Sequence, residues 1–168
     1  VTGYYHILAD TLLGARIERF KRRQNRQVIT RAAKFYLFDV GVAGAITKRH
    51  IEEEKGALFG KAFEHFILME IAAYNSYNEI DYEINFWRTK SGMEVDFVLG
   101  GGDVAIEVKS ATLIEQRDLH PLNAFIEEYS PRKALIVCNE REERVHGRIR
   151  IMPYRNFLSE LWEGKIIS

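Results

Sequence analysis

Cysteine is almost absent from this sequence, since Cys138 is the only one among 168 residues. A single thiol excludes a disulfide within the chain and a zinc site built from several thiolates. Cys138 ends the apolar run 134–138, where we expect a small buried hydrophobic residue. The five histidines lack metal-ligand spacing, and His65 is expected to be a surface or structural residue.

A signal peptide is also missing, and no apolar stretch is long enough to cross a bilayer. We therefore expect a soluble, cytoplasmic protein without a membrane partner. No internal repeat or low-complexity segment occurs. With 46% hydrophobic and 12% aromatic residues, the chain is able to bury one core, which predicts a single domain.

Net charge is zero, because 24 basic residues balance 24 acidic ones. The balance fails locally in a basic stretch over residues 16–34, where Glu18 is the only acid. Its basic residues are Arg16, Arg19, Lys21, Arg22, Arg23, Arg26, Arg31 and Lys34. Such a stretch suits phosphate contacts with nucleic acid, and it suits equally a surface that docks another protein domain.

Hydrophobic periodicity predicts helices that alternate with strands. Expected helices span residues 2–13, 40–46, 56–74, 116–129 and 153–162. Expected strands flank a turn at residues 24–25 and also span 34–38, 80–89, 94–99, 104–109, 133–138, 149–152 and 165–167. The helix over 56–74 is apolar on nearly every side, so we expect it to be buried against other elements.

The most informative segment is the predicted hairpin over residues 94–109. If its turn is centred between Gly101 and Gly102, Asp96 and Glu107 lie directly opposite each other, because both are equally far from that point. Opposed residues have Cβ atoms about 5 Å apart. Side chains alternate between the two faces of a strand, so the apolar residues on either side of Glu107 are expected to enter a core, namely Val104, Ile106 and Val108.

Two carboxylates at that separation repel each other unless a cation neutralises them. A Mg2+ or Mn2+ ion suits oxygen ligands and carries water that is able to become the attacking hydroxide. Lys109 lies about 6.6 Å beyond Glu107 on the same strand face, where it is placed to hold or polarise that water. This set of residues predicts metal-dependent cleavage of a phosphodiester. The alternative is a cross-strand salt bridge on a solvated sheet face, and the opposed Asp96 favours the metal site.

Glu64 interrupts the apolar pattern of the helix over 56–74. On a helical projection its face carries Ala57, Gly60, Ile67, Leu68 and Ile71. A charge in such surroundings needs a cation or hydrogen-bond donors. A metal role and a structural ion pair with Lys34 or Lys109 are both open.

The order of these elements resembles the core of the PD-(D/E)XK nuclease superfamily: a helix with Glu64, a strand, a strand with Asp96, a strand with Glu107 and Lys109, a helix and a strand. The chain also resembles the uncharacterised domain at the carboxyl end of many archaeal and bacterial AAA-type ATPases. The segments that carry this second resemblance are Lys34–Gly41, Gly60–Phe66, Phe86–Phe97, Ala105–Ser110, Met152-Pro153, Phe157-Leu158 and Leu161-Trp162.

The resemblance implies an α/β domain over residues 16–168 with a restriction-endonuclease-like core over 56–139, in which helices flank a mixed β-sheet. Residues 1–15 would be the remnant of a winged-helix-like linker that follows an ATPase domain outside this chain. The sequence starts at Val1 without an initiator methionine, so we expect a piece of a longer protein.

The resemblance also implies roles for single residues. Glu64, Asp96 and Glu107 correspond to the metal-binding acids, with Mg2+ or Mn2+ as the cofactor, and Lys109 corresponds to the catalytic lysine. Val95 stands where the superfamily name implies a proline, a departure that removes no acid.

The partners so implied are nucleic acid, DNA first, and the ATPase domain. Candidates for phosphate contacts are Arg88 and Lys90 beside the turn that precedes Asp96, and Arg22 and Arg23 in the basic stretch. Solvated charges at a strand end are the alternative for the first two. The leading function is metal-dependent hydrolysis of DNA. The alternatives are a catalytically silent regulatory module of the ATPase and a nucleic-acid-binding domain that uses the basic stretch alone.

Overall fold

The computed structural model describes residues 13–21, 33–46 and 56–167. The helix expected over 2–13 and the turn expected at 24–25 lie outside these ranges, as do Arg22 and Arg23. No helix in the described part of the chain is long and apolar enough to span a membrane.

The amino-terminal half contains β1 (Gly14–Arg19), β2 (Ala33–Leu37), α2 (Val40–Ile46), α3 (Gly56–Tyr77), β3 (Ile84–Arg88) and β4 (Glu94–Leu99). The carboxyl-terminal half contains β5 (Val104–Val108), the 3₁₀ helix η1 (Gln116–Leu119), α4 (His120–Tyr129), β6 (Lys133–Cys138), β7 (Arg144–His146), β8 (Ile149–Pro153) and α5 (Tyr154–Trp162).

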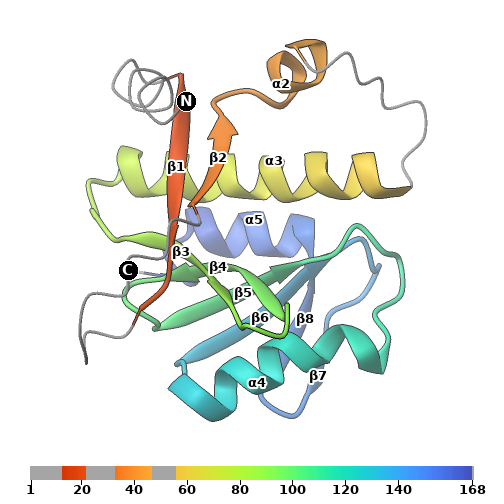
Figure 1. Ribbon diagram of the computed structural model, residues 1–168. Coiled ribbons are helices and arrows are strands. Elements are labelled where there is room, and N and C mark those ends of the chain that lie inside the picture. The colour runs from red at the N-terminus through yellow and green to blue at the C-terminus, as the bar shows by residue number, and fades with distance from the viewer. Residues whose placement is uncertain (1–12, 22–32, 47–55, 168) are drawn as a thin grey trace.

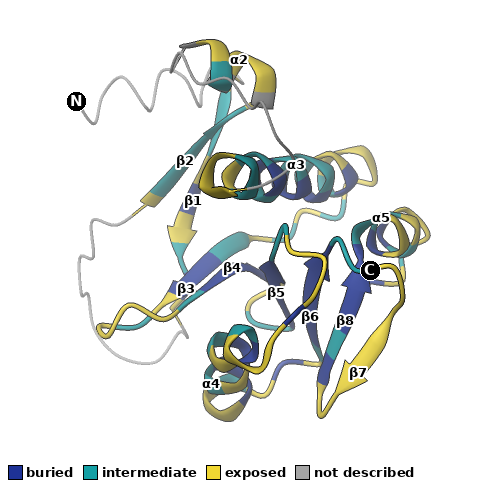
Figure 2. Ribbon diagram, turned by 90° about the vertical axis from the view of Figure 1, so that its right-hand side faces the viewer, coloured by how far each residue is buried: buried dark blue, intermediate teal, exposed yellow. Residues whose placement is uncertain are grey.

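The strands form one sheet in the order β2-β1-β3-β4-β5-β6-β8-β7. It is mixed, because β1 pairs with β3 in parallel and β5, β6 and β8 run parallel to one another, whereas the other pairs are antiparallel. Helices α3 and α5 lie on one face and α4 lies on the other (Figure 1 and Figure 2). The expected α/β class, with helices that flank a mixed sheet, is confirmed.

Both faces of the central sheet carry a core, so all five residues of β5 are buried. Val104, Ile106 and Val108 pack in the core beneath α3, as their spacing predicts, while Ala105 belongs to the core beneath α4. Burial on both faces is typical of sheets in which helices connect parallel strands. Asp96 and Glu107, on these central strands, therefore have little access to water.

Three local differences from the expected elements have physical causes. The helix expected over 116–129 begins as the 3₁₀ turn η1, and α4 starts only where Pro121 occupies its first turn. The strand β7 was not expected. The closing strand expected over 165–167 was wrong: the carbonyls of Lys165 and Ile166 accept hydrogen bonds from Lys133 Nζ, so side chains satisfy this backbone instead of a strand partner.

The β4–β5 hairpin has the register that its glycine turn predicts. Phe97 pairs with Ile106 and Leu99 with Val104, which centres the turn between Gly101 and Gly102. The paired residues end one position before Asp96 and Glu107, and β4 shifts its register against β3 between Val98 and Val95. Gly100, Gly101 and Gly102 all have positive φ, a backbone conformation that glycine adopts without steric cost.

We expect Gly102→Ala to weaken the fold more than Gly101→Ala. Gly102 has φ of +103° and a Cβ there would lie 2.9 Å from Phe20 Cζ, whereas a Cβ at Gly101 meets no atom within 4 Å. The unfavourable φ alone costs about 1–2 kcal/mol at either position, and the buried Phe20 ring adds overpacking of about 1 kcal/mol or more at Gly102. Urea denaturation of the two variants measures the difference, and equal losses would contradict the proposed contact with Phe20.

Candidate active site

Asp96 lies on β4, at the end of the β4–β5 hairpin away from its glycine turn, and is buried, with 9% of its surface exposed. Its Oδ2 accepts a hydrogen bond from the backbone N–H of Val108 on the neighbouring strand, at 2.9 Å. Its Oδ1 lies 3.6 Å from Lys34 Nζ. One oxygen is thus held by the backbone of β5, and the other faces a cation.

Glu107 is buried more deeply than Asp96, with 3% of its surface exposed. Lys109 Nζ donates to its Oε1 at 2.6 Å, so the two residues form an ion pair along one face of the strand. Glu107 Oε2 is buried and has no hydrogen-bond partner among the described residues. The expected alternative of a solvated cross-strand salt bridge does not describe this carboxylate, which is buried and paired with the residue that directly follows its own strand.

Lys34 brings three carboxylates together. Its Nζ lies 2.5 Å from Glu94 Oε1, 3.1 Å from Glu64 Oε1 and 3.6 Å from Asp96 Oδ1. The hydroxyl of Tyr36, two residues further along the same face of β2, donates to Glu64 Oε1 at 2.5 Å. The ion pair between Glu64 and Lys34, one of the two alternatives for Glu64, is therefore present.

The position of Lys34 depends on how the edge of the sheet bends. Three steps of the strand order separate β2 from β4, yet Lys34 reaches Glu94 and Asp96. The β1–β2 pair rises alongside α3 instead of continuing level with the central strands (Figure 1 and Figure 2). His65 secures this contact, because its Nε2–H donates to the Leu37 carbonyl of β2 at 2.5 Å. His65 is a structural residue, as expected.

Burial and like charge act together on the two central acids. The pKa of Asp96 is raised well above its ordinary value, mainly by burial and then by the charges of Glu107 and Glu64. The pKa of Glu107 is also raised by burial, and the ammonium of Lys109 limits the rise. Burial opposes the charge of Lys34, but the neighbouring Asp96 and Glu64 raise its pKa overall. The acids thus hold protons more firmly than exposed carboxylates do.

The donor chemistry of these acids fits a hard divalent cation, although no three of them surround one point. Within the described residues, no group of three or more histidine, cysteine, aspartate or glutamate side chains is arranged to hold a metal ion. A Mg2+ ion needs only one or two carboxylates, since it keeps several waters and takes oxygens from substrate phosphates. Asp96 and Glu107, with the unpartnered Oε2, offer that minimum.

The expected phosphate contacts differ in their surroundings. Arg88 is exposed at the end of β3. Its Nε lies 3.5 Å from Glu94 Oε2, and Glu94 is one of the three carboxylates that contact Lys34. Lys90 is exposed in the following turn. Lys34 itself points to the acids, so it is not part of an exposed basic surface.

Sequence reasoning missed Tyr36 and Glu94 as members of the site. Strand alternation contains the signal for both, because Tyr36 shares a face with Lys34 and Glu94 shares a face with Asp96. Nothing in the local pattern, however, indicates that these two faces meet.

The fold and this site define an α/β domain with a buried carboxylate cluster, neutralised by lysines, at one end of a mixed sheet. Over residues 59–157 the sequence matches the family described as "Domain of unknown function (DUF4143)". This match covers more than half of the chain, which therefore belongs to that family. No curated protein and no solved structure matches the chain.

Lys34→Met is expected to destabilise the protein in the absence of divalent ions. The change leaves Glu64, Glu94 and Asp96 close together without their shared cation, and breaking a largely buried ion pair in this way costs about 3 kcal/mol. The free energy of unfolding in urea with EDTA measures the loss. Lys165→Met is the control, since Lys165 is exposed and its ammonium forms an ion pair with Glu163, at a distance from the acids in the sequence. Equal effects of both substitutions would show that the cluster does not depend on Lys34.

Stability is expected to fall as pH rises above about 4, the ordinary pKa range of carboxyl groups. The pKa of Asp96 is raised in the folded state, so the unfolded chain releases this proton first and gains stability relative to the fold. Asp96→Asn should remove much of this decline and raise the free energy of unfolding by about 1 kcal/mol at pH 8. Denaturant titrations at pH 5 and pH 8 in EDTA test this. Asp103→Asn removes an exposed carboxylate from the same hairpin and should not stabilise the protein.

Proposed function

We propose that the protein is a metal-dependent nuclease that hydrolyses phosphodiester bonds in DNA. The observation that carries the proposal is the buried pair of Asp96 and Glu107 on adjacent strands, with Lys109 hydrogen-bonded to Glu107. Burial raises the pKa values of both carboxylates, and the charge of Glu107 raises that of Asp96 further; such groups are uncommon in purely structural sites, because they cost stability.

The acids would hold Mg2+ or Mn2+ by their oxygens. Asp96 and Glu107 are the two primary ligands, and Glu64, which the Lys34 ammonium links to Asp96, is the third acid of the site. When bound, such an ion supplies an activated water and neutralises charge on the phosphate. Loss of the protons held by Asp96 and Glu107 would accompany binding, since ligating carboxylates must be ionised.

Lys109 would act on the water and on the phosphate. Its Nζ lies at Glu107, and its side chain is 35% exposed, so it is accessible to a substrate that approaches the end of the sheet. A positioned ammonium stabilises negative charge that develops on phosphate oxygens. Its raised pKa keeps the group charged at neutral pH.

Two further observations support the proposal. The described elements follow the order helix with Glu64, two strands with Asp96 on the second, strand with Glu107 and Lys109, helix and strand, which is the order of the PD-(D/E)XK nuclease core that the sequence resembles. Arg88 borders the acids and is placed to contact a phosphate. By the same resemblance, the partners are DNA, inside the cell, and an ATPase domain that precedes this one in the full protein.

A second function is favoured by Lys34. A lysine that neutralises Glu64, Glu94 and Asp96 provides the charge that a metal would supply. In that case the domain keeps the acid cluster for structure and serves the ATPase as a regulatory or nucleic-acid-binding module. Metal affinity and cleavage separate the two functions.

Lys109→Ala is expected to lower Mn2+-dependent cleavage by about two to four orders of magnitude, the usual loss when a positioned acid–base or electrostatic group is removed. DNA affinity should change little, since one lysine among many phosphate contacts contributes modestly. The measurement is cleavage of linear, circular and branched DNA by the purified protein. Lys165→Ala, which removes another paired lysine far from the acids in the sequence, should leave cleavage intact.

Asp96→Ala distinguishes a ligand from a bystander in the same assay. It should abolish cleavage and weaken Mn2+ binding together, as measured by the paramagnetic resonance signal of free Mn2+, while Asp103→Ala should do neither. Metal binding without cleavage of any DNA or RNA form would contradict the nuclease and favour the regulatory module.

A further inference from the structure

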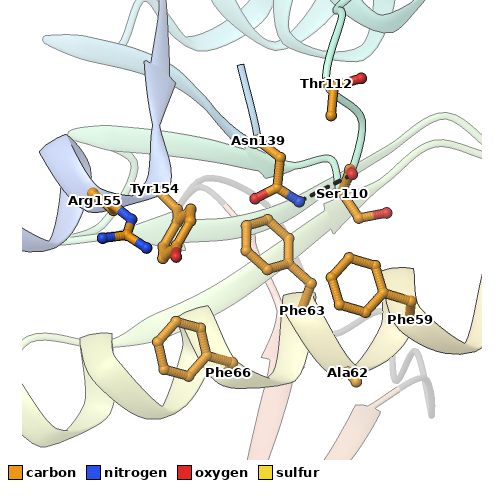
Figure 3. A pocket seen from close by; sticks show the side chains of 9 residues that line it. All are labelled: Phe59, Ala62, Phe63, Phe66, Ser110, Thr112, Asn139, Tyr154 and Arg155. Carbon is orange, nitrogen blue, oxygen red and sulfur yellow. Dashed lines mark hydrogen bonds between the residues drawn. The ribbon is translucent and has the colours of Figure 1, made fainter. Parts of the chain in front are cut away.

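An open pocket of about 690 Å³ lies between α3 and the carboxyl ends of three parallel strands (Figure 3). Its volume falls within the range of roughly 300–1,000 Å³ that small-ligand sites occupy. None of its lining residues is one of the acids of the candidate active site. It is therefore a separate feature with its own chemistry.

Polar groups reach the pocket from the strand ends. Ser110 follows β5, Asn139 follows β6 and Arg155 follows β8, and the carboxyl ends of parallel strands meet at one edge of a sheet. In open α/β sheets, ligands bind in the crevice outside these ends. Asn139 Nδ2 donates to the Ser110 carbonyl at 3.1 Å, which fixes both residues. The Ser110 hydroxyl makes no hydrogen bond with another described residue and lies toward the pocket (Figure 3).

Aromatic rings line the opposite wall. Phe59 and Phe63 lie one helical turn apart on α3, with their rings stacked at a centroid distance of 6.2 Å and an interplanar angle of 19°. Tyr154 meets Phe63 edge-on at 5.7 Å. Phe63 is buried, whereas Phe59 is only partly buried, so part of the Phe59 ring is accessible to a flat ligand. Rings of this kind stack on nucleobases of any sequence.

Arg155 makes the pocket suitable for an anion. Its guanidinium lies 5.6 Å from the centre of the Tyr154 ring and forms no ion pair with a carboxylate in the described ranges. No acidic residue lines the pocket. Helix α5 begins at Tyr154 without a side-chain cap and without an acid in its first turn, so its free N–H groups add positive potential there. A planar guanidinium on an aromatic ring suits a phosphate.

The aromatic wall of the pocket suits an unpaired base, and the guanidinium without an ion pair suits a phosphate. Together with the polar groups at the strand ends, they fit a nucleotide whose base is unpaired. The pocket also adjoins the acids along the chain, because Ser110 directly follows Lys109 and Phe63 directly precedes Glu64. We propose that this pocket binds an unpaired nucleotide, with the base against Phe59 and the phosphate at Arg155. Resting on the proposed nuclease function, this inference makes a single strand or a frayed strand end the preferred substrate.

The test is binding without metal, so that its outcome does not depend on cleavage. A fluorescently labelled twelve-residue oligothymidylate is titrated with the protein in EDTA, and anisotropy is compared with that of a duplex of the same length. We expect the single strand to bind more tightly, and Phe59→Ala to weaken its binding about tenfold, as loss of one stacked base does. Arg155→Gln should weaken binding and reduce its dependence on salt.

Matched controls separate these effects from general damage. Tyr77→Ala removes an aromatic ring from the other end of α3, where Tyr77 is 82% exposed, and Arg148→Gln removes a positive charge before the amino end of β8. Both should bind the single strand as the native protein does. Phe59→Leu keeps the bulk of the side chain without a stacking face, and it should weaken binding even if Phe59→Ala does not fold.

Competition with adenosine monophosphate identifies the source of the nucleotide. Weak competition supports a strand as the ligand, and strong competition that Phe59→Ala abolishes supports a free nucleotide in the same pocket. The inference is overturned if the duplex binds as well as the single strand, or if the Phe59 and Arg155 variants bind like their controls. Cleavage without such binding would support the nuclease function and contradict the nucleotide pocket. Binding without cleavage would support the pocket and contradict the nuclease function.

Discussion

Neutralisation of buried carboxylates is the constraint on which this structure depends. Asp96 and Glu107 lie on adjacent central strands, under helices on both faces, where an unpaired charge is costly. Two lysines offset that cost: Lys109, which directly follows the strand of Glu107, and Lys34, from a strand three steps away from β4 in the sheet. The bend that carries β1 and β2 alongside α3 therefore brings one of the two neutralising ammonium groups to the acids.

The same constraint connects stability with the proposed chemistry. Buried carboxylates with raised pKa values make a fold less stable than apolar residues of similar size would. Such groups are retained where their ionised form has a function. A divalent ion would relieve the repulsion that Lys34 and Lys109 offset only in part, since Glu107 Oε2 has no hydrogen-bond partner in the part of the chain that the structure describes. Lys34 thus matters for both proposed functions. In the nuclease its ammonium would lie beside the metal ion, and in the regulatory module it would supply the positive charge in place of the metal.

The local part of the site was predictable from the sequence. Strand alternation and the glycine turn predict that Asp96 and Glu107 oppose each other, and the observed pairing, which ends one residue earlier at Phe97 and Ile106, has the turn centre that this prediction assumes. The position of Glu64 on a buried helix indicated that it needs a cation or hydrogen-bond donors, and Lys34 was one of the two lysines considered for an ion pair. The tail over 165–167 was not predictable as a strand or a loop, because its apolar residues are buried either way.

What the sequence determined by itself follows from short-range rules: the period of two along strands, the period of 3.6 along helices, and the preference of glycine for positive φ. The tertiary structure decided which faces meet. Only the bend of β2 over α3 brings Lys34 and Tyr36 to Glu64, and only the parallel order of β5, β6 and β8 gathers Ser110, Asn139 and Arg155 around one pocket. These contacts join residues distant in sequence, and packing of the whole domain selects them, so no local pattern specifies them.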